Sequence, residues 1–148
     1  MSTDRVADAV SAEAVQPRDR GAPVIRTIAM PADTNPAGDI FGGWLMAQMD
    51  LAAGNVAARR ARGRCATISV EAMTFHSPVF VGDEVSLYAR ILKVGRTSIR
   101  IHVEVWRRER ESEATRKVTE GTFTFVAIGP DRLPRPVPPE DVSPADAA

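Results

Sequence analysis

The chain has 148 residues, which is enough for one domain of ordinary size, and 44% hydrophobic and 26% charged residues are typical of a globular protein. Its 19 Lys and Arg cancel its 19 Asp and Glu, so the basic surplus on which nucleic-acid binding relies is missing. The single cysteine, Cys65, excludes a disulfide within the chain, and no apolar run approaches the roughly 20 residues that span a bilayer. We therefore expect a cytoplasmic protein that binds neither nucleic acid nor membrane.

The two ends of the chain differ in composition from its middle. Residues 1–22 mix Ala, Asp, Arg and Ser without a long apolar core, which predicts a disordered arm and not a secretory signal. From Pro130 onward the chain is rich in proline, which removes backbone donors. Residues 130–148 are therefore predicted to be an extended tail outside the sheet, and the folded unit is predicted to span residues 23–129.

The first half of that unit predicts a short strand, a loop and one helix. Residues 24–30 are β-prone, and residues 31–41 are dense in turn-forming Pro, Asn, Asp and Gly. Residues 43–61 are full of Leu, Met and Ala and end in arginines, whose charge suits a helix C-terminus. A helix with so little polar surface must be covered by a sheet or by a partner.

The second half alternates with period two and predicts four long strands. In residues 97–107, one face carries Ile99, Ile101, Val103 and Val105, and the other carries Arg100, His102, Glu104 and Trp106. The short turns between the strands predict that successive strands pair in antiparallel fashion. The predicted fold class is α+β, a curled antiparallel sheet wrapped around a long central helix. The predicted strands are residues 67–76, 84–94, 97–107 and 118–128.

Asp50 is the only charge between Asp39 and Arg59, in the middle of the predicted helix. A carboxylate sequestered there costs several kcal/mol unless something compensates it, and aspartate is also a poor mid-helix residue. Such a residue is a functional candidate; the alternative is a structural carboxylate that caps a backbone amide or pairs across an interface. Its neighbours on the helix surface are all apolar and mostly small: Gly43, Met46, Ala53, Gly54 and Ala57.

The loop before the helix offers two further candidates. The Asn35 amide can orient a water or a carbonyl, or it can be an ordinary turn asparagine. Gly42 and Gly43 open the helix with free N–H groups that can stabilise an oxyanion, or they can be a flexible helix entry. At 1.5 Å per residue, Gly42 and Asp50 are roughly 12 Å apart along the axis. We therefore expect a site shared by two copies of the chain, Asp50 from one and Gly42 and Asn35 from the other.

Other chemistry is disfavoured by the sequence. It contains no Gly-x-Ser-x-Gly elbow, phosphate-binding glycine loop or paired-cysteine metal motif, so we expect no metal site. Neither His76 nor His102 lies near the helix in sequence, which argues against a histidine-based hydratase. Cys65 stands at a predicted strand start without a histidine beside it, and we interpret it as a packed thiol, not a nucleophile.

A longer pattern runs through the folded unit. Residues 27–50 contain the unusual elements Gly-Gly-Trp and Gln-Met-Asp in the order of the opening of YciA-type hot-dog acyl-CoA thioesterases. The sequence resembles this family over about residues 25–129. The resemblance continues through Val-Glu-Ala-Met-Thr-Phe, Val-Gly-Asp, Lys-Val-Gly-Arg-Thr-Ser and Glu-Val-Trp at residues 70–75, 81–83, 93–98 and 104–106.

The resemblance implies a hot-dog dimer, further assembled into a trimer of dimers, that cleaves fatty acyl-CoA to fatty acid and CoA. It implies no metal or cofactor, because coenzyme A is part of the substrate. The catalytic aspartate of the family corresponds to Asp50 and its loop asparagine to Asn35. A stretch near the CoA nucleotide corresponds to Gly95, Arg96, Thr97 and Ser98, which can otherwise be a generic hairpin turn. Relatives often have Lys or Arg where this chain has Ser77, so a phosphate contact there is lost or passes to His76.

Two routes fit these residues. With the thioester carbonyl polarised by the Gly42 or Gly43 amide, Asp50 acts as general base on a water that Asn35 positions, or it attacks directly and forms an anhydride. The alternatives to an enzyme are a non-catalytic acyl-CoA-binding regulator and a structural oligomerisation domain. Acyl chain length depends on how several apolar side chains pack, which periodicity does not give: Trp44, Met46, Met49 and Phe75.

Overall fold

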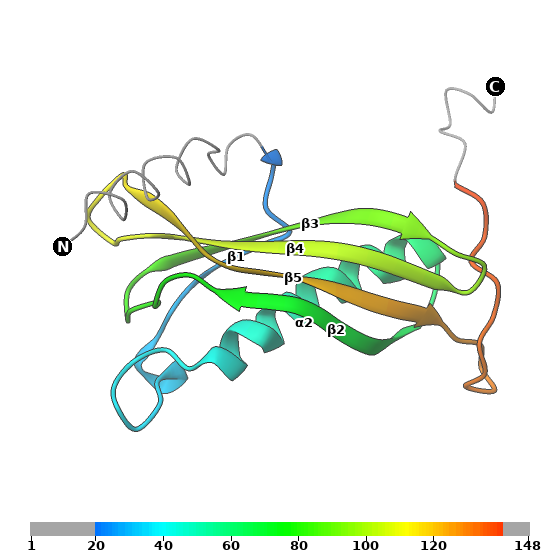
Figure 1. The fold of residues 1–148 in the computed structure, drawn as a ribbon, viewed down its shortest axis with the longest axis horizontal. Helices are drawn as coiled ribbons and strands as arrows, with labels where there is room; N and C mark the ends of the chain where they lie inside the picture. Colours follow the sequence, from blue (N-terminus) through cyan, green and yellow to red (C-terminus); the bar gives the residue numbers. More distant parts are fainter. Residues whose placement is uncertain (1–19, 141–148) are drawn as a thin grey trace.

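The computed structural model describes residues 20–140 and contains one long helix and one sheet (Figure 1). The predicted arm, residues 1–22, lies almost entirely outside the described residues, as does the predicted tail beyond residue 140. In chain order the elements are β1 (Ile25–Ile28), the 3-10 helix η2 (Pro31–Asp33), α2 (Gly42–Ala61), β2 (Cys65–Phe75), β3 (Glu84–Val94), β4 (Ser98–Arg108) and β5 (Thr115–Ala127).

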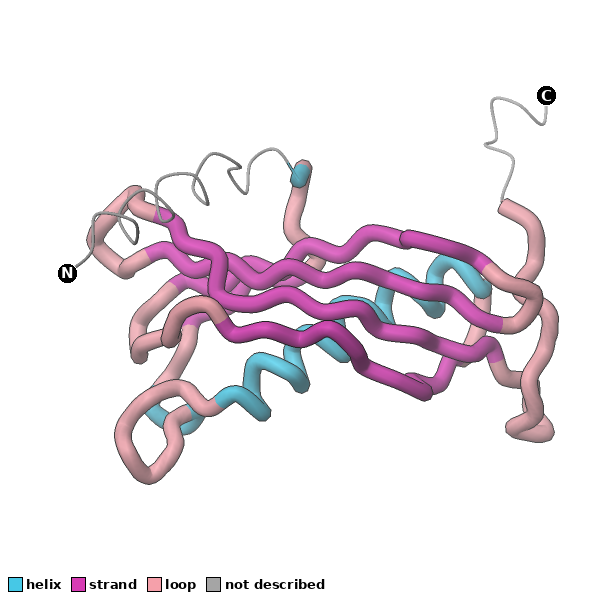
Figure 2. Tube along the Cα trace, in the orientation of Figure 1, coloured by secondary structure: helices cyan, strands magenta, loops and turns pink. Residues whose placement is uncertain are grey.

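The five strands form a single antiparallel sheet in the order β1-β3-β4-β5-β2, and this sheet curls around α2 (Figure 2). The predicted curled sheet around a central helix is therefore confirmed. The expectation that all successive strands pair is wrong at one place, because β2 pairs with β5 and not with β3. The connection over residues 76–83 contains Pro78 and is long enough to cross the end of the helix, so β2 closes the far side of the curl.

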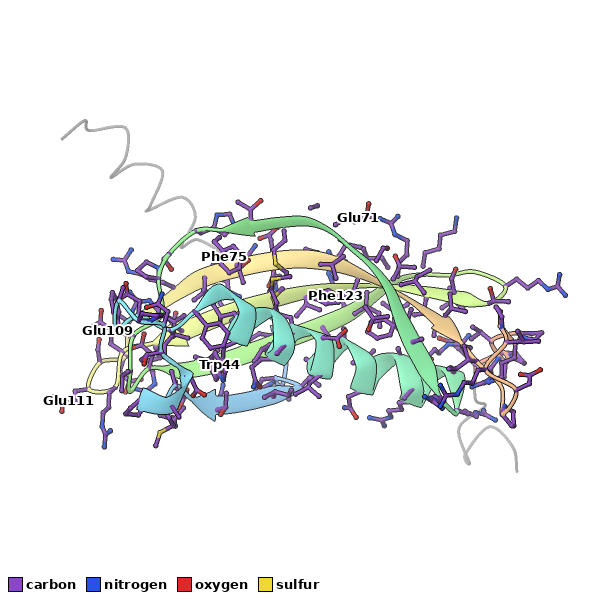
Figure 3. The ribbon with its side chains drawn as sticks, turned by 90° about the horizontal axis from the view of Figure 1, so that it is seen from below. Trp44, Glu71, Phe75, Glu109, Glu111 and Phe123 are labelled. Atoms are coloured by element: carbon purple, nitrogen blue, oxygen red, sulfur yellow. The ribbon has the colours of Figure 1, made fainter. Side chains whose placement is uncertain are left out.

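The core lies between the concave face of the sheet and one side of α2. Alternate residues of β4, from Ile99 to Val105, are fully buried, as the period-two pattern predicts. Phe123 of β5 lies between sheet and helix in Figure 3. The buried side of the helix carries two large apolar residues in its first half and four alanines after them, and the alanines permit a close approach of the sheet. These buried helix residues are Leu45, Met49, Ala52, Ala53, Ala57 and Ala61.

The two sheet edges differ greatly. β1 has four residues, whereas β2 has eleven and is largely exposed along its length, including the apolar side chains of Ile68 and Val70. A long, exposed, apolar edge strand is a template for pairing with another chain. The fold therefore leaves one long strand edge open beside α2. Among residues 20–140, no helix is long and apolar enough to cross a bilayer.

The segment that follows β5 packs against the C-terminal end of α2. The Arg135 guanidinium donates to Ala61 O at 3.0 Å and to Ile128 O at 3.1 Å, so it caps the helix. A Cβ on Gly63 would lie 2.5 Å from Arg135 Nη2, so a side chain at this position would displace the guanidinium. The Val137 amide donates to Arg96 O at 2.8 Å and so connects the segment to the β3–β4 turn. The division into arm, domain and tail stays a prediction.

Candidate active site

Asp50 lies on the side of α2 that faces β2. Its Oδ1 accepts a hydrogen bond of 2.6 Å from the Thr67 hydroxyl, which fixes the direction of the carboxylate. Of its helix neighbours, Ala53 and Ala57 are fully buried, but Met46 is exposed, and Asp50 itself is half-buried. In one chain the carboxylate is therefore only partly withdrawn from solvent, on the side where the sheet edge is open. No sequence signal points to Thr67, because threonine is a common strand residue.

The N-terminus of α2 lies at the other end of β2. The N-cap residue Phe41 is extended, and Gly42 and Gly43 form the first exposed turn, whose amides have no intrahelical carbonyl to bond. The Phe75 ring, at the end of β2, lies 3.4 Å from the place where a Cβ on Gly42 would stand (Figure 3). Gly42 thus lines a hollow of about 330 Å³ at this end of the helix. Its lining is Ile40, Gly42, Leu45, Phe75, His76, Ser77, Pro78 and Val79.

Asn35 folds the loop that leads into this helix. Its Oδ1 accepts hydrogen bonds from the amides of Ala37 at 3.0 Å and Asp39 at 3.1 Å, and its own backbone amide donates to Asp39 O. The side-chain oxygen is thereby committed to the loop, as in a turn asparagine. Only the Nδ2 group of the Asn35 side chain is therefore available to a ligand. It can donate a hydrogen bond that orients a water or a carbonyl, but it cannot accept a proton.

The residues expected near the CoA nucleotide lie far from the helix N-terminus. Ser98 pairs with Val126 at one end of β5, whereas the His76 amide donates to Val118 O near the other end. Eight residues of strand separate the two places, roughly 26 Å at 3.3 Å per residue. The Gly95–Ser98 turn is closed by a hydrogen bond of 2.7 Å from Gly95 N to Ser98 O. Within a single chain, the turn expected to contact the CoA nucleotide and His76 therefore lie at opposite ends of the sheet.

Cys65 is not prepared for nucleophilic chemistry. Burial raises the pKa of its thiol above the ordinary value, and the positive charge of Arg135 only partly opposes this effect. The thiol donates a weak hydrogen bond to Gly63 O at 3.9 Å. It is therefore protonated near neutral pH and behaves as a packed thiol.

A group of titratable residues lies on the sheet face that turns away from α2. Ligand atoms of His102, Glu104 and Glu120 lie within 4.8 Å of one another, a spacing that a metal ion can use. However, Arg20 donates to both Glu104 oxygens at 2.6 and 3.0 Å, and Lys117 forms ion pairs with both Glu104 and Glu120. Burial lowers the pKa of His102, although both glutamates oppose this. Because protein cations already balance the carboxylates, we assign no metal to this group.

The hydrogen bonds and ion pairs of Glu104 are expected to make part of the free energy of unfolding sensitive to acid. Burial raises the pKa of Glu104, but hydrogen bonds from Arg20 and Trp106 and the charge of Lys117 outweigh it and lower the pKa from 4.5 to about 2. The folded chain then binds fewer protons than the unfolded chain between these values, so the stabilisation is complete above about pH 4.5 and is lost as the pH falls toward 2.

We expect Glu104→Gln to abolish this part of the pH dependence. Urea unfolding at about pH 7 and about pH 3 measures it, with Glu113→Gln in the exposed hairpin as control. Equal losses in the wild type and Glu104→Gln would contradict the assignment.

Comparisons with known proteins show the family to which the chain belongs. The family model described as the thioesterase superfamily matches residues 37–114. The chain belongs to the thioesterase superfamily. A Zymomonas mobilis protein named as an acyl-CoA thioester hydrolase is 60% identical over 119 residues, 80% of each chain. The acyl-CoA thioester hydrolase YciA of Salmonella typhimurium is 53% identical over 122 residues, 80% of this chain and 92% of the relative.

Solved structures of this superfamily share the fold. A hexameric hotdog fold thioesterase of Campylobacter jejuni is 40% identical, has a TM-score of 0.77, and matches over 82% of this chain and 93% of its own. The resemblance to YciA-type proteins and the predicted hot-dog fold are both confirmed. Membership of the superfamily does not by itself assign a role to each residue of this chain, so these roles are proposed from the geometry of the site.

Proposed function

We propose that this chain hydrolyses fatty acyl-CoA thioesters to a fatty acid and CoA, with Asp50 as the central catalytic residue of a site that two copies share. It is an acyl-CoA hydrolase of the kind that its relatives are named for. The observation that carries the proposal is the position of two groups at opposite ends of one exposed edge strand: the Asp50 carboxylate beside Thr67, and the Gly42 amide beside Phe75.

Antiparallel pairing of two β2 strands completes the site. If a twofold axis passes near Glu71, Thr67 of one copy lies opposite the partner's Phe75, because the two residues are equally far from the centre in sequence. Asp50 then approaches the partner's helix N-terminus across the edge. The roughly 12 Å that separates Gly42 from Asp50 within one helix no longer matters. Pairing also covers the apolar edge side chains and withdraws Asp50 further from water.

The chemistry requires only water and the groups of the chain. The thioester carbonyl accepts hydrogen bonds from the Gly42 or Gly43 amide, which stabilises the oxyanion as it forms. As general base, Asp50 takes a proton from water held by Asn35 Nδ2, and the hydroxide adds to the carbonyl carbon. The C–S bond then breaks, and Asp50 returns the proton to the leaving sulfur to release the thiol of CoA. As nucleophile, Asp50 adds to the carbonyl itself, the thiolate leaves, and water opens the resulting anhydride.

The same pairing supports the proposed CoA contacts. The β3–β4 turn with Gly95, Arg96, Thr97 and Ser98 lies at the end of the sheet where β2 begins, and His76 follows the end of β2. Antiparallel pairing therefore brings the turn of one copy toward the partner's His76. Arg96 and the hydroxyls of Thr97 and Ser98 supply donors for phosphate oxygens there. We further propose a cytoplasmic location and a trimer of these dimers, which the hexameric state of the Campylobacter jejuni thioesterase supports.

A thiol-release assay tests the function. We expect the purified chain to liberate free CoA from fatty acyl-CoA esters without added metal, and a series of increasing acyl length identifies the preferred chain. Single-turnover hydrolysis in heavy-oxygen water separates the two routes, because label enters the Asp50 carboxylate only by the direct route. Tight binding of every ester without release of thiol would instead identify a non-catalytic acyl-CoA-binding protein.

A further inference from the structure

We propose that the buried ion pair between Asp83 and Arg107 is a positioning element of the active site, which holds the N-terminus of α2 where its amides serve the reaction. This inference rests on the proposed function, since it concerns the Gly42 and Gly43 amides. Neither Asp83 nor Arg107 belongs to the catalytic groups, and both act through the backbone between β2 and β3.

A continuous set of contacts leads from the ion pair to the helix. Arg107 Nη1 donates to Asp83 Oδ2 at 3.2 Å, and the same oxygen accepts a hydrogen bond of 2.9 Å from the amide of Phe80. Asp83 N donates back to Phe80 O at 3.1 Å, which closes the turn. The residue before Phe80 is Val79, whose carbonyl accepts a hydrogen bond of 3.3 Å from Ile40 N.

Ile40 stands two residues before the helix. Its backbone also forms an isolated bridge with Thr34, so it closes the loop that carries Asn35. The position of Val79 therefore fixes both the entry to α2 and the Asn35 loop. A second anchor holds the turn from its other side, because Gly82 N donates to Ala29 O at 2.8 Å and Ala29 N donates to Asp83 O at 3.0 Å. Gly82 has φ +94°, a conformation that other residues rarely adopt.

The energetics of the pair favour a role in geometry over one in stability. Asp83 is 4% exposed and Arg107 is 7% exposed, so both charges are removed from water. Arg107 Nε is buried without a hydrogen-bond partner, and the guanidinium lies 5.3 Å from the centre of the Phe80 ring. Burial of two charges with incomplete hydrogen bonding costs about as much as their attraction returns. The strength of a hydrogen bond depends on its direction, so the hydrogen bonds to Asp83 permit only one arrangement of the turn. Apolar contacts would tolerate several.

The neighbouring residue provides a matched control. Glu84 follows Asp83 in the chain, and its carboxylate pairs with Arg108 at 3.3 Å, as Asp83 pairs with Arg107. Glu84, the first residue of β3, is directly opposite Arg108 of β4 in the register, and Asp83 stands just before β3 in the turn. Only the Asp83 carboxylate also binds the Phe80 amide of the turn. Loss of Glu84 therefore weakens the same two strands without releasing the helix entry.

The test replaces the pair with apolar residues of similar volume, Asp83→Val with Arg107→Met, in the full chain. Because such replacements of a buried ion pair are often neutral for stability, we expect a folded assembly with unfolding free energy close to wild type. We expect kcat to fall by roughly 10-fold to 100-fold, as for a small misplacement of reacting groups, with KM unchanged within about threefold. Glu84→Gln is expected to keep the wild-type kcat.

Hydrogen exchange supplies a readout that needs no substrate. The Ile40 amide is expected to exchange faster in the double variant, while the amide of Val103 in the sheet centre stays as protected as in wild type. If the double variant does not fold, Asp83→Asn replaces it, since the amide retains an acceptor for Phe80 N–H but removes the buried negative charge that pairs with Arg107. A folded variant with wild-type kcat and unchanged Ile40 exchange overturns the proposal. Absence of thiol release in the wild type would instead refute the proposed function, and Ile40 exchange would still decide the positioning role.

Discussion

Asp50→Asn is expected to lower kcat for acyl-CoA hydrolysis by at least about 100-fold, which is the low end for loss of an acid–base group. Asparagine keeps the shape and the oxygen that accepts from the Thr67 hydroxyl, but it cannot take a proton from water or attack a thioester as a carboxylate does. The change leaves the helix surface and the β2 edge unaltered, so the assembly is expected to survive. Steady-state thiol release and size-exclusion chromatography measure the two effects.

A carboxylate outside the site separates this effect from a change of charge. Glu113 is exposed in the β4–β5 hairpin, and Glu113→Gln is expected to retain full activity. An Asp50→Asn protein that hydrolyses acyl-CoA at the wild-type rate would remove Asp50 from the catalytic role. The carboxylate would then serve only the contact with Thr67.

The second large effect is expected at the helix N-terminus. Gly42→Pro removes the amide donor at the first position of a helix, where proline is well tolerated. The preceding residue also suits it, since Phe41 has φ −80° and ψ 148°, the extended conformation that proline requires before it. We expect kcat to fall by roughly 100-fold to 1,000-fold, as for loss of an oxyanion donor.

Alanine at the same position is the matched control for proline. A Cβ on Gly42 meets the Phe75 ring at 3.4 Å, which is ordinary contact, and the amide remains. We therefore expect Gly42→Ala to keep activity within about threefold of wild type, because no donor is lost. If alanine and proline reduce kcat equally, crowding by Phe75 is responsible and the amide is not.

A mixture of the two inactive variants tests whether the site is shared. In a dimer of Asp50→Asn with Gly42→Pro, one site contains both changes and the other contains neither. Random exchange of subunits is therefore expected to restore about a quarter of the wild-type activity. An unfolding and refolding step provides the exchange. No recovery after verified mixing would show that Asp50 and Gly42 act within one chain.

Most of the fold is predictable because its elements are periodic. The predicted third strand, residues 84–94, agrees with β3, and the predicted helix over 43–61 begins one residue late. The largest error in bounds is at β5, which begins at Thr115 and not at residue 118. The polar character of residues 109–116 predicts a hairpin loop, yet Thr115 and Arg116 already pair with Arg108 and Arg107, because backbone pairing needs no apolar side chain.

The active-site residues divide in the same way. Asp50 is predicted because a charge is unusual in an apolar helix, whereas Asn35 and Gly42 also fit an ordinary turn and a flexible helix entry, and the resemblance to the family is what selects Asn35. The structure brings Asp50 to the sheet edge but keeps it apart from the helix N-terminus. Thr67 is not predicted, since a hydroxyl on a strand carries no signal of its partner. The role of Asn35 also differs in detail, because its oxygen is used to close its own loop.

Local patterns are sufficient to predict the helix, the strands and the one carboxylate that does not belong in an apolar helix, because periodicity and chemical conflict are visible within single segments. Three further features arise only when the chain is folded: β2 pairs with β5, Thr67 holds Asp50, and Asp83 meets Arg107 beneath the turn. These contacts join residues far apart in the chain. Their partners are chosen by how the curled sheet closes around the helix, and no local pattern encodes that closure.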